Sequence, residues 1–161
     1  MATVKISYAS PTFVNCTIAS LASSSTLARS SASIDNSSNL YDDALLYVSV
    51  KVSGTAIGQD KSVYVYVYGA GGTSQLGSDK ENVGTDSSVN LENPTNLLGP
   101  VVIACPGTAR NYTTVFPIAP FFSGRMPKTW GFVVRNSTNQ LLDPNESYHQ
   151  KHYTGITYTV V

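Results

Sequence analysis

The clearest pattern in the chain is an unbroken alternation of valine and tyrosine in residues 61–68. The valines hold the odd positions and the tyrosines the even ones: Val63, Val65, Val67, Tyr64, Tyr66 and Tyr68. A period of two residues is typical of a β-strand, because successive side chains there point to opposite faces. The pattern predicts a strand with an apolar face and a tyrosine face.

A second run, residues 45–52, shows the same period. Val48, Val50 and Val52 share one parity, whereas Tyr47, Ser49 and Lys51 share the other. Gly54 and Gly58 lie between the two runs. This arrangement favours a hairpin that merges the valines of both strands into one apolar face.

Other segments also have strand-like patterns, and none has helix caps or a helical apolar stripe. We expect strands in residues 3–8, 12–21, 27–34, 97–105, 111–122, 128–136 and 153–161. The nearly continuous apolar run 97–105 predicts a strand buried on both faces. Pro117 and Pro120 confine residues 111–122 to a sheet edge or a bulge. The expected fold is all-β: a jelly-roll-like, two-sheet antiparallel sandwich of about eight strands.

Residues 69–89 are rich in Gly, Ser, Asp and Asn and have no sustained period, so they predict a long surface loop. Loops of this kind often carry interaction surfaces. The glycines do not follow the spacing of a dinucleotide-binding or P-loop motif, which argues against nucleotide binding.

The length of 161 residues suits a single domain spanning residues 1–161. Only 12% of the residues are charged, and ten basic side chains balance ten acidic ones. A neutral chain has no net field to attract nucleic acid or an anionic membrane, so we expect neither partner. Low net charge gives little protection against association, so we expect a homo-oligomer or docking on a larger body; ordinary solubility through Ser and Thr hydration is the alternative.

The chain starts without a basic region followed by an apolar stretch, so we expect no signal peptide and synthesis in a cytoplasm. No stretch approaches the length of a membrane span. Cys16 and Cys105 lie far apart in the sequence. Two buried free thiols are the simpler interpretation, and a disulfide closing a long loop is the alternative.

Candidate reaction chemistry is sparse. His149 and His152 are the only histidines, and at a spacing of three on a strand they would face opposite sides, so we expect no metal site and interpret them as exposed loop residues. Asp60 or Asp143 beside one of them is the remaining catalytic possibility. No nucleophile elbow is present. We therefore expect a non-enzymatic protein without a cofactor.

The tyrosine face, formed by Tyr64, Tyr66 and Tyr68, is the candidate interaction surface. Each ring combines apolar area with a hydroxyl group, which suits contact with another protein or, alternatively, with a sugar. Cover by a second sheet, a loop or a neighbouring subunit would also account for these rings. Trp130 is expected in the core.

Residues 35–68, the Pro94-Thr95-Asn96-Leu97 turn and residues 126–136 together resemble a family of small β-sandwich virion proteins of tailed bacteriophages. The likeness spans roughly two-thirds of the chain. It implies a structural role without an active site.

The resemblance gives a leading functional hypothesis: a late virion protein, made in the host cytoplasm, that decorates or cements the capsid. Its expected partner is the major capsid protein or another virion protein. A neck or tail component is an alternative within the same class. A glycan-binding module or host-surface adhesin is the alternative from another class, and a histidine-dependent hydrolase is a third.

Overall fold

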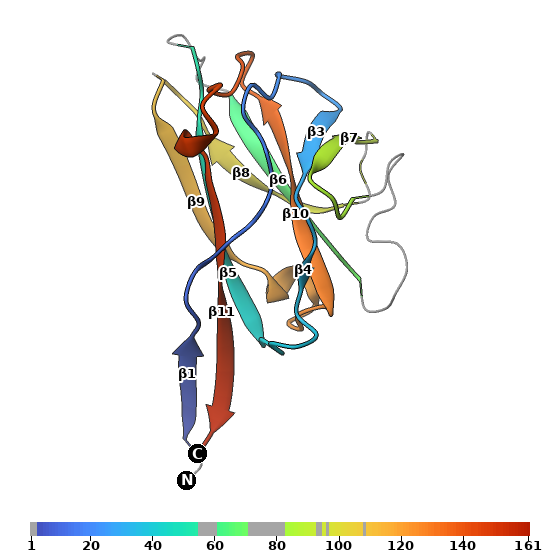
Figure 1. Ribbon diagram of the computed structural model, residues 1–161, viewed down its shortest axis with the longest axis vertical. Helices are drawn as coiled ribbons and strands as arrows, with labels where there is room; N and C mark the ends of the chain where they lie inside the picture. Colours follow the sequence, from blue (N-terminus) through green and yellow to red (C-terminus); the bar gives the residue numbers. More distant parts are fainter. Residues whose placement is uncertain (1–2, 55–60, 71–82, 93–94, 96, 108) are drawn as a thin grey trace.

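The computed structural model confirms an all-β fold with two antiparallel sheets (Figure 1). It describes all residues except 1–2, 55–60, 71–82, 93–94, 96 and 108. Its strands, more numerous than the eight expected, are β1 (Val4–Tyr8), β2 (Thr12–Phe13), β3 (Leu27–Ser30), β4 (Ile34–Asp35), β5 (Asp43–Lys51), β6 (Ser62–Ala70), β7 (Ser87–Asn90), β8 (Leu98–Ala104), β9 (Asn111–Pro117), β10 (Thr129–Ser137) and β11 (Gln150–Val160). Two short 3-10 turns, η1 (Ala119–Phe122) and η2 (Glu146–Tyr148), complete the described elements.

Sheet A has the strand order β1-β11-β5-β9, with β2 also paired to β11. Sheet B has the order β7-β3-β10-β6-β8, with β4 also paired to β10. The two sheets pack face to face as a sandwich (Figure 1). Within the described residues, no helix is long and apolar enough to cross a membrane.

The predicted hairpin between the two valine runs is wrong. β5 pairs with β9 and β11 in sheet A, whereas β6 pairs with β8 and β10 in sheet B. The valines of both strands nevertheless share one fully buried core, because each strand turns its valine face toward the opposite sheet. The alternation identified the apolar faces correctly but did not distinguish pairing within a sheet from packing between sheets.

Residues 97–105 were expected to be buried on both faces, and this prediction is also wrong. β8 is an edge strand that pairs only with β6, and its residue Val102 is 51% exposed. Pro117 lies on β9 at the edge of sheet A, as its missing N–H requires. Strand β10 agrees with the expected strand at 128–136.

Only Thr12–Phe13 of the predicted strand 12–21 forms a strand. The following residues cross from one sheet to the other: the Val14 amide donates to the Lys151 carbonyl, and the Asn15 carbonyl accepts from Ala32. Residues 27–34 form β3 and the start of β4, with a break between them. Residues 71–82 of the predicted loop lie outside the described residues.

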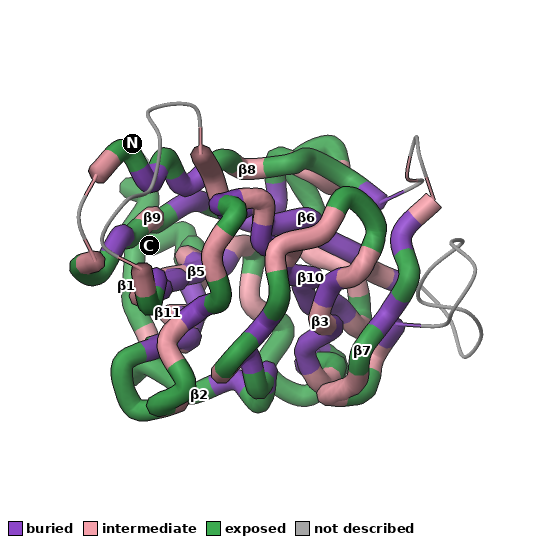
Figure 2. Tube along the Cα trace, turned by 90° about the horizontal axis from the view of Figure 1, so that it is seen from above, coloured by how far each residue is buried: buried purple, intermediate pink, exposed green. Residues whose placement is uncertain are grey.

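The main core fills the space between the sheets, and Trp130 is buried there as predicted. The view from above shows buried positions concentrated on β5, β6 and β10 (Figure 2). Cys16 and Cys105 are both buried and free, so the free-thiol interpretation is confirmed. Burial disfavours the thiolate; it raises the pKa of Cys16 and raises that of Cys105 to about 11.

Candidate interaction surface

The tyrosine face lies on the outer side of sheet B, where a second, smaller core covers much of it. Tyr66 is 5% exposed and Tyr68 is 2% exposed. The other buried members of this core are Ala28, Val83, Val89, Leu91, Leu97 and Val133. Tyr66 and Tyr68 are therefore covered within the chain itself, in agreement with the alternative of a covered face and not with an open contact surface.

Tyr68 is held by hydrogen bonds as well as by burial. Its hydroxyl donates to the Ser31 carbonyl at 2.8 Å and lies 3.3 Å from the Ser31 Oγ. Burial raises the pKa of Tyr68 to about 12, so the phenol stays neutral. Gly131 pairs with Tyr68 across β10 and β6, and a Cβ there would overlap the Tyr68 ring. The Tyr68 ring occupies the space that a side chain at position 131 would fill.

Tyr64 is the member of the tyrosine face that stays partly accessible. The Arg135 guanidinium lies 4.6 Å from the centroid of its ring, within the range of a cation–π contact. This contact covers part of the ring from the neighbouring strand β10. A role for Tyr64 in partner binding stays a prediction.

His149 is not the exposed loop residue that was expected: it is 2% exposed. Its Nδ1 accepts from the Lys51 amide at 3.2 Å, and its Nε2 lies 2.9 Å from the Asp143 carbonyl. These contacts fix a neutral ring with the proton on Nε2. Burial lowers the pKa of His149, because the charged ring would lose its hydration. His149, directly before β11, thus connects the end of β5 at Lys51 with the segment that contains Asp143.

His152 takes a different role and does not converge with His149 on a common site. Its ring stacks on Tyr47 with centroids 4.4 Å apart. Among the described residues, no three His, Cys, Asp or Glu side chains gather into a possible cation site. The Asp143 carboxylate pairs with Lys51 at 3.1 Å, and Asp60 lies outside the described residues. The described part of the chain thus brings no catalytic histidine set together.

Lys151 is fully buried and forms an ion pair with Glu146. The second carboxylate oxygen of Glu146 accepts from the backbone amides of Ile18 and Ala19 at 2.9 and 2.7 Å. Such a pair satisfies a buried ammonium group and joins η2, β11 and the crossing segment. Its surroundings give it a structural role in the body of the sandwich.

The outer side of sheet A carries the apolar surface that the sequence did not identify. A single row crosses four strands, because Phe13 pairs with His152, His152 with Tyr47, and Tyr47 with Val115. Paired residues point to the same face of a sheet. Phe13 is 62% exposed and Val115 55% exposed. With Leu45 on the same face of β5, these residues form what we call the outer stripe: Phe13, Leu45, Tyr47, Val115 and His152.

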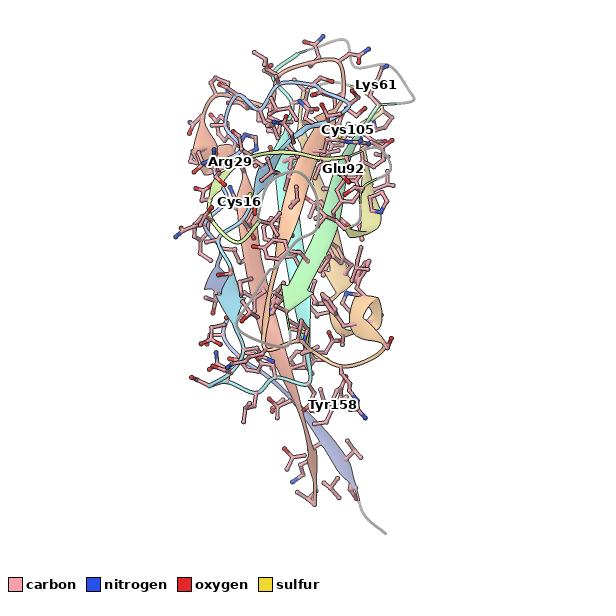
Figure 3. All side chains as sticks on the ribbon, turned by 90° about the vertical axis from the view of Figure 1, so that its right-hand side faces the viewer. Cys16, Arg29, Lys61, Glu92, Cys105 and Tyr158 are labelled. Carbon is pink, nitrogen blue, oxygen red and sulfur yellow. The ribbon has the colours of Figure 1, made fainter. Side chains whose placement is uncertain are left out.

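The same face continues beyond the body of the sandwich. β1 and the end of β11 form a two-stranded ribbon that projects from one end of the molecule (Figure 1). Five exposed residues of one parity form its apolar ribbon face: Val4, Ile6, Tyr8, Tyr158 and Val160. Tyr158, which pairs with Ile6, lies on this projection below the body of the sandwich (Figure 3). The opposite, polar ribbon face carries Lys5, Ser7, Thr157 and Thr159.

A shallow pocket of about 240 Å³ lies between the segments 12–15 and 32–35, beside Tyr153. This volume is below the range usual for small-molecule sites. Asp35 is the one carboxylate among its lining residues. The extended apolar surface of sheet A is therefore the more informative feature.

Comparison with known proteins identifies no family model that matches the chain and no curated protein that matches it. Two matching solved structures are particles of cowpea mosaic virus. An empty virus-like particle gives 12% identity and a TM-score of 0.34 over 96% of this chain and 83% of that chain. The naturally occurring empty top component gives 11% identity and a TM-score of 0.30 over 100% and 89% of the respective chains. Likenesses this distant carry no inference about function.

Proposed function

We propose that this chain is a non-enzymatic structural protein of a bacteriophage virion, most simply a decoration protein that docks on the major capsid protein and stabilises the head. The outer stripe carries the proposal. It places the exposed Phe13 and Val115 and the partly exposed Tyr47 and His152 in one row on paired strands rather than on a loop. Apolar surface of this kind is typical of contacts between proteins.

The resemblance to small phage virion proteins supports the same role. So does the balance of charges, which suits docking on a protein surface rather than on nucleic acid. His149, Asp143 and Glu146 make structural contacts within the described chain. The glycan-binding alternative loses its main support, because Tyr66 is buried.

Binding to capsids purified without this chain tests the proposal. Wild type should co-sediment with the capsids, and Val115→Glu should weaken binding by at least about tenfold, since it places a charge within the apolar contact, at the β9 end of the row. Val102→Glu is the matched control: Val102 is a valine of similar exposure, 51% against 55%, on the outer side of sheet B. It should bind like wild type.

Two outcomes contradict this proposal. Failure of the wild-type chain to bind capsids removes the decoration role, and equal losses in Val115→Glu and Val102→Glu remove the outer stripe as the contact. Immunogold labelling of virions separates the neck or tail alternative, because label would then lie at the tail instead of over the head.

A further inference from the structure

The projecting ribbon has a face that no part of the described chain covers. Its five apolar residues, Val4, Ile6, Tyr8, Tyr158 and Val160, are between 48% and 69% exposed. A two-stranded ribbon has marginal stability in water unless its apolar face packs against something. We infer that the occupant is a second copy of this chain, whose own apolar ribbon face packs on the first about a two-fold axis.

The first argument is area. An aromatic side chain offers roughly 150 to 250 Å² and an aliphatic one less, so these five, each about half to two-thirds exposed, leave on the order of 500 Å² to be covered in each copy. Two copies together then bury about 1,000 Å², which is the lower limit for a specific interface. Nearly the whole apolar ribbon face must be covered to reach that limit. A second ribbon can do this, because it has the same length and width.

The second argument is the order of side-chain sizes along β1. The small Val4 lies at the ribbon tip, Ile6 in the middle and the large Tyr8 at the base. When two ribbons pack in opposite directions, the tip of each lies over the base of the other. Along β1, Val4 then meets Tyr8 of the partner, so that a large residue faces a small one, while Ile6 and its cross-strand pair Tyr158 each meet their own equivalents near the axis. The two bodies lie at opposite ends and do not collide.

The third argument is polarity. The charged Lys5 and the hydroxyls of Ser7 and Thr157 belong to the polar ribbon face, so they stay in water when the apolar face is covered. The paired ribbons form a small four-stranded, two-layer unit with apolar residues inside and polar residues outside. Such layers pack about 10 Å apart, which the side chains of this face can fill.

Sedimentation equilibrium of wild type, Ile6→Glu and Ser7→Glu tests this inference. These are neighbouring positions on one strand that receive the same charge on opposite faces. Wild type should approach twice the chain mass of 17.2 kDa at high micromolar concentration. Ile6→Glu should raise the dissociation constant at least about 100-fold, whereas Ser7→Glu should change it less than about threefold.

Cross-linking tests the direction of packing. Ile6→Cys should be joined to its equivalent by a short bis-maleimide, and Ser7→Cys should not, because only the former lies at the two-fold axis. Cys16 and Cys105 are buried and do not compete for the reagent. Far-UV circular dichroism spectra of all variants should match that of wild type, because the ribbon lies outside the two cores.

The inference is independent of the proposed virion role. A wild-type chain that remains monomeric overturns it, and so does a trimer or equal disruption by Ile6→Glu and Ser7→Glu. A monomer whose capsid binding is lost in Ile6→Glu would assign the ribbon to the capsid instead. Loss of capsid binding in Val115→Glu with the dimer intact would leave the inference standing.

Discussion

At the scale of single residues, the chain uses polar side chains to join segments that the sheets do not connect. His149 binds the main chain of Lys51 and Asp143, and Glu146 binds Lys151 and two amides of the crossing segment. Each satisfies a donor or acceptor that burial would otherwise leave unpaired. His149 and Asp143 were candidates for chemistry in the sequence, but their contacts give them structural roles.

His149 makes stability depend on pH. Burial lowers its pKa in the folded chain below the value near 6.5 expected when unfolded. The unfolded chain therefore binds a proton more readily, and the free energy of unfolding falls as pH drops from about 6.5 toward the lowered pKa. Above that range the contribution is fully present.

We expect urea midpoints of wild type to fall between pH 7.5 and pH 5, and those of His149→Gln to fall less. The variant should also lose about 1 to 3 kcal/mol at pH 7.5, because its amide does not reproduce both hydrogen bonds. His152→Gln, at the stacked and partly exposed histidine, is the control. A wild-type midpoint unchanged over this range would contradict the assignment.

At the scale of elements, the sequence predicted faces better than partners. The alternation in β6 gave the correct strand and inward valines, because period two follows from strand geometry alone. It did not predict that β5 lies in the other sheet. Nor did it show that β8 is at an edge, since an apolar run describes composition and not the number of neighbours.

The candidate surface was misplaced for a related reason. Tyrosine suits both a buried position with a bonded hydroxyl and an exposed contact. Tyr66 and Tyr68 occupy buried positions because residues 83–91 and Leu97 contribute to a small core over sheet B. The outer stripe is formed by single residues of four strands, so no local pattern marks it. The apolar ribbon face was visible as alternation in residues 3–8, but its lack of cover was not.

Gly131→Ala tests how tightly the small core of sheet B is packed. Because the new methyl group would overlap the Tyr68 ring, we expect a loss of about 1 to 3 kcal/mol in unfolding free energy. Gly107→Ala is the matched control: its nearest neighbour would be the Tyr112 hydroxyl at 4.0 Å. Chemical denaturation of both variants measures these free energies of unfolding. Similar values for Gly131→Ala and Gly107→Ala would contradict tight packing around Tyr68.

At the scale of the whole molecule, the chain combines a well-packed body with an uncovered projection. The body buries apolar residues in two cores, whereas sheet A and the ribbon together expose an apolar strip along one side. Formal charges cancel, so long-range repulsion between copies is weak. Association through this strip should depend on apolar contact more than on charge.

The dependence of dimer affinity on salt concentration tests whether apolar contacts or charges hold the two copies together. An interface made by ion pairs weakens as salt rises, because the screening length shrinks from about 10 Å at 0.1 M to about 3 Å at 1 M. We expect the dimer of the wild-type chain to keep or increase its affinity over this range in sedimentation experiments. A loss of tenfold or more would show that charges hold the copies together.

The burial of Cys16 and Cys105 as free thiols has a consequence for stability under different redox conditions. Because the fold closes no covalent cross-link through sulfur, its stability does not depend on the redox potential around it. The same chain should melt at the same temperature with or without a reductant. A fold built in this way needs no disulfide to form when the surrounding solution changes from reducing to oxidising.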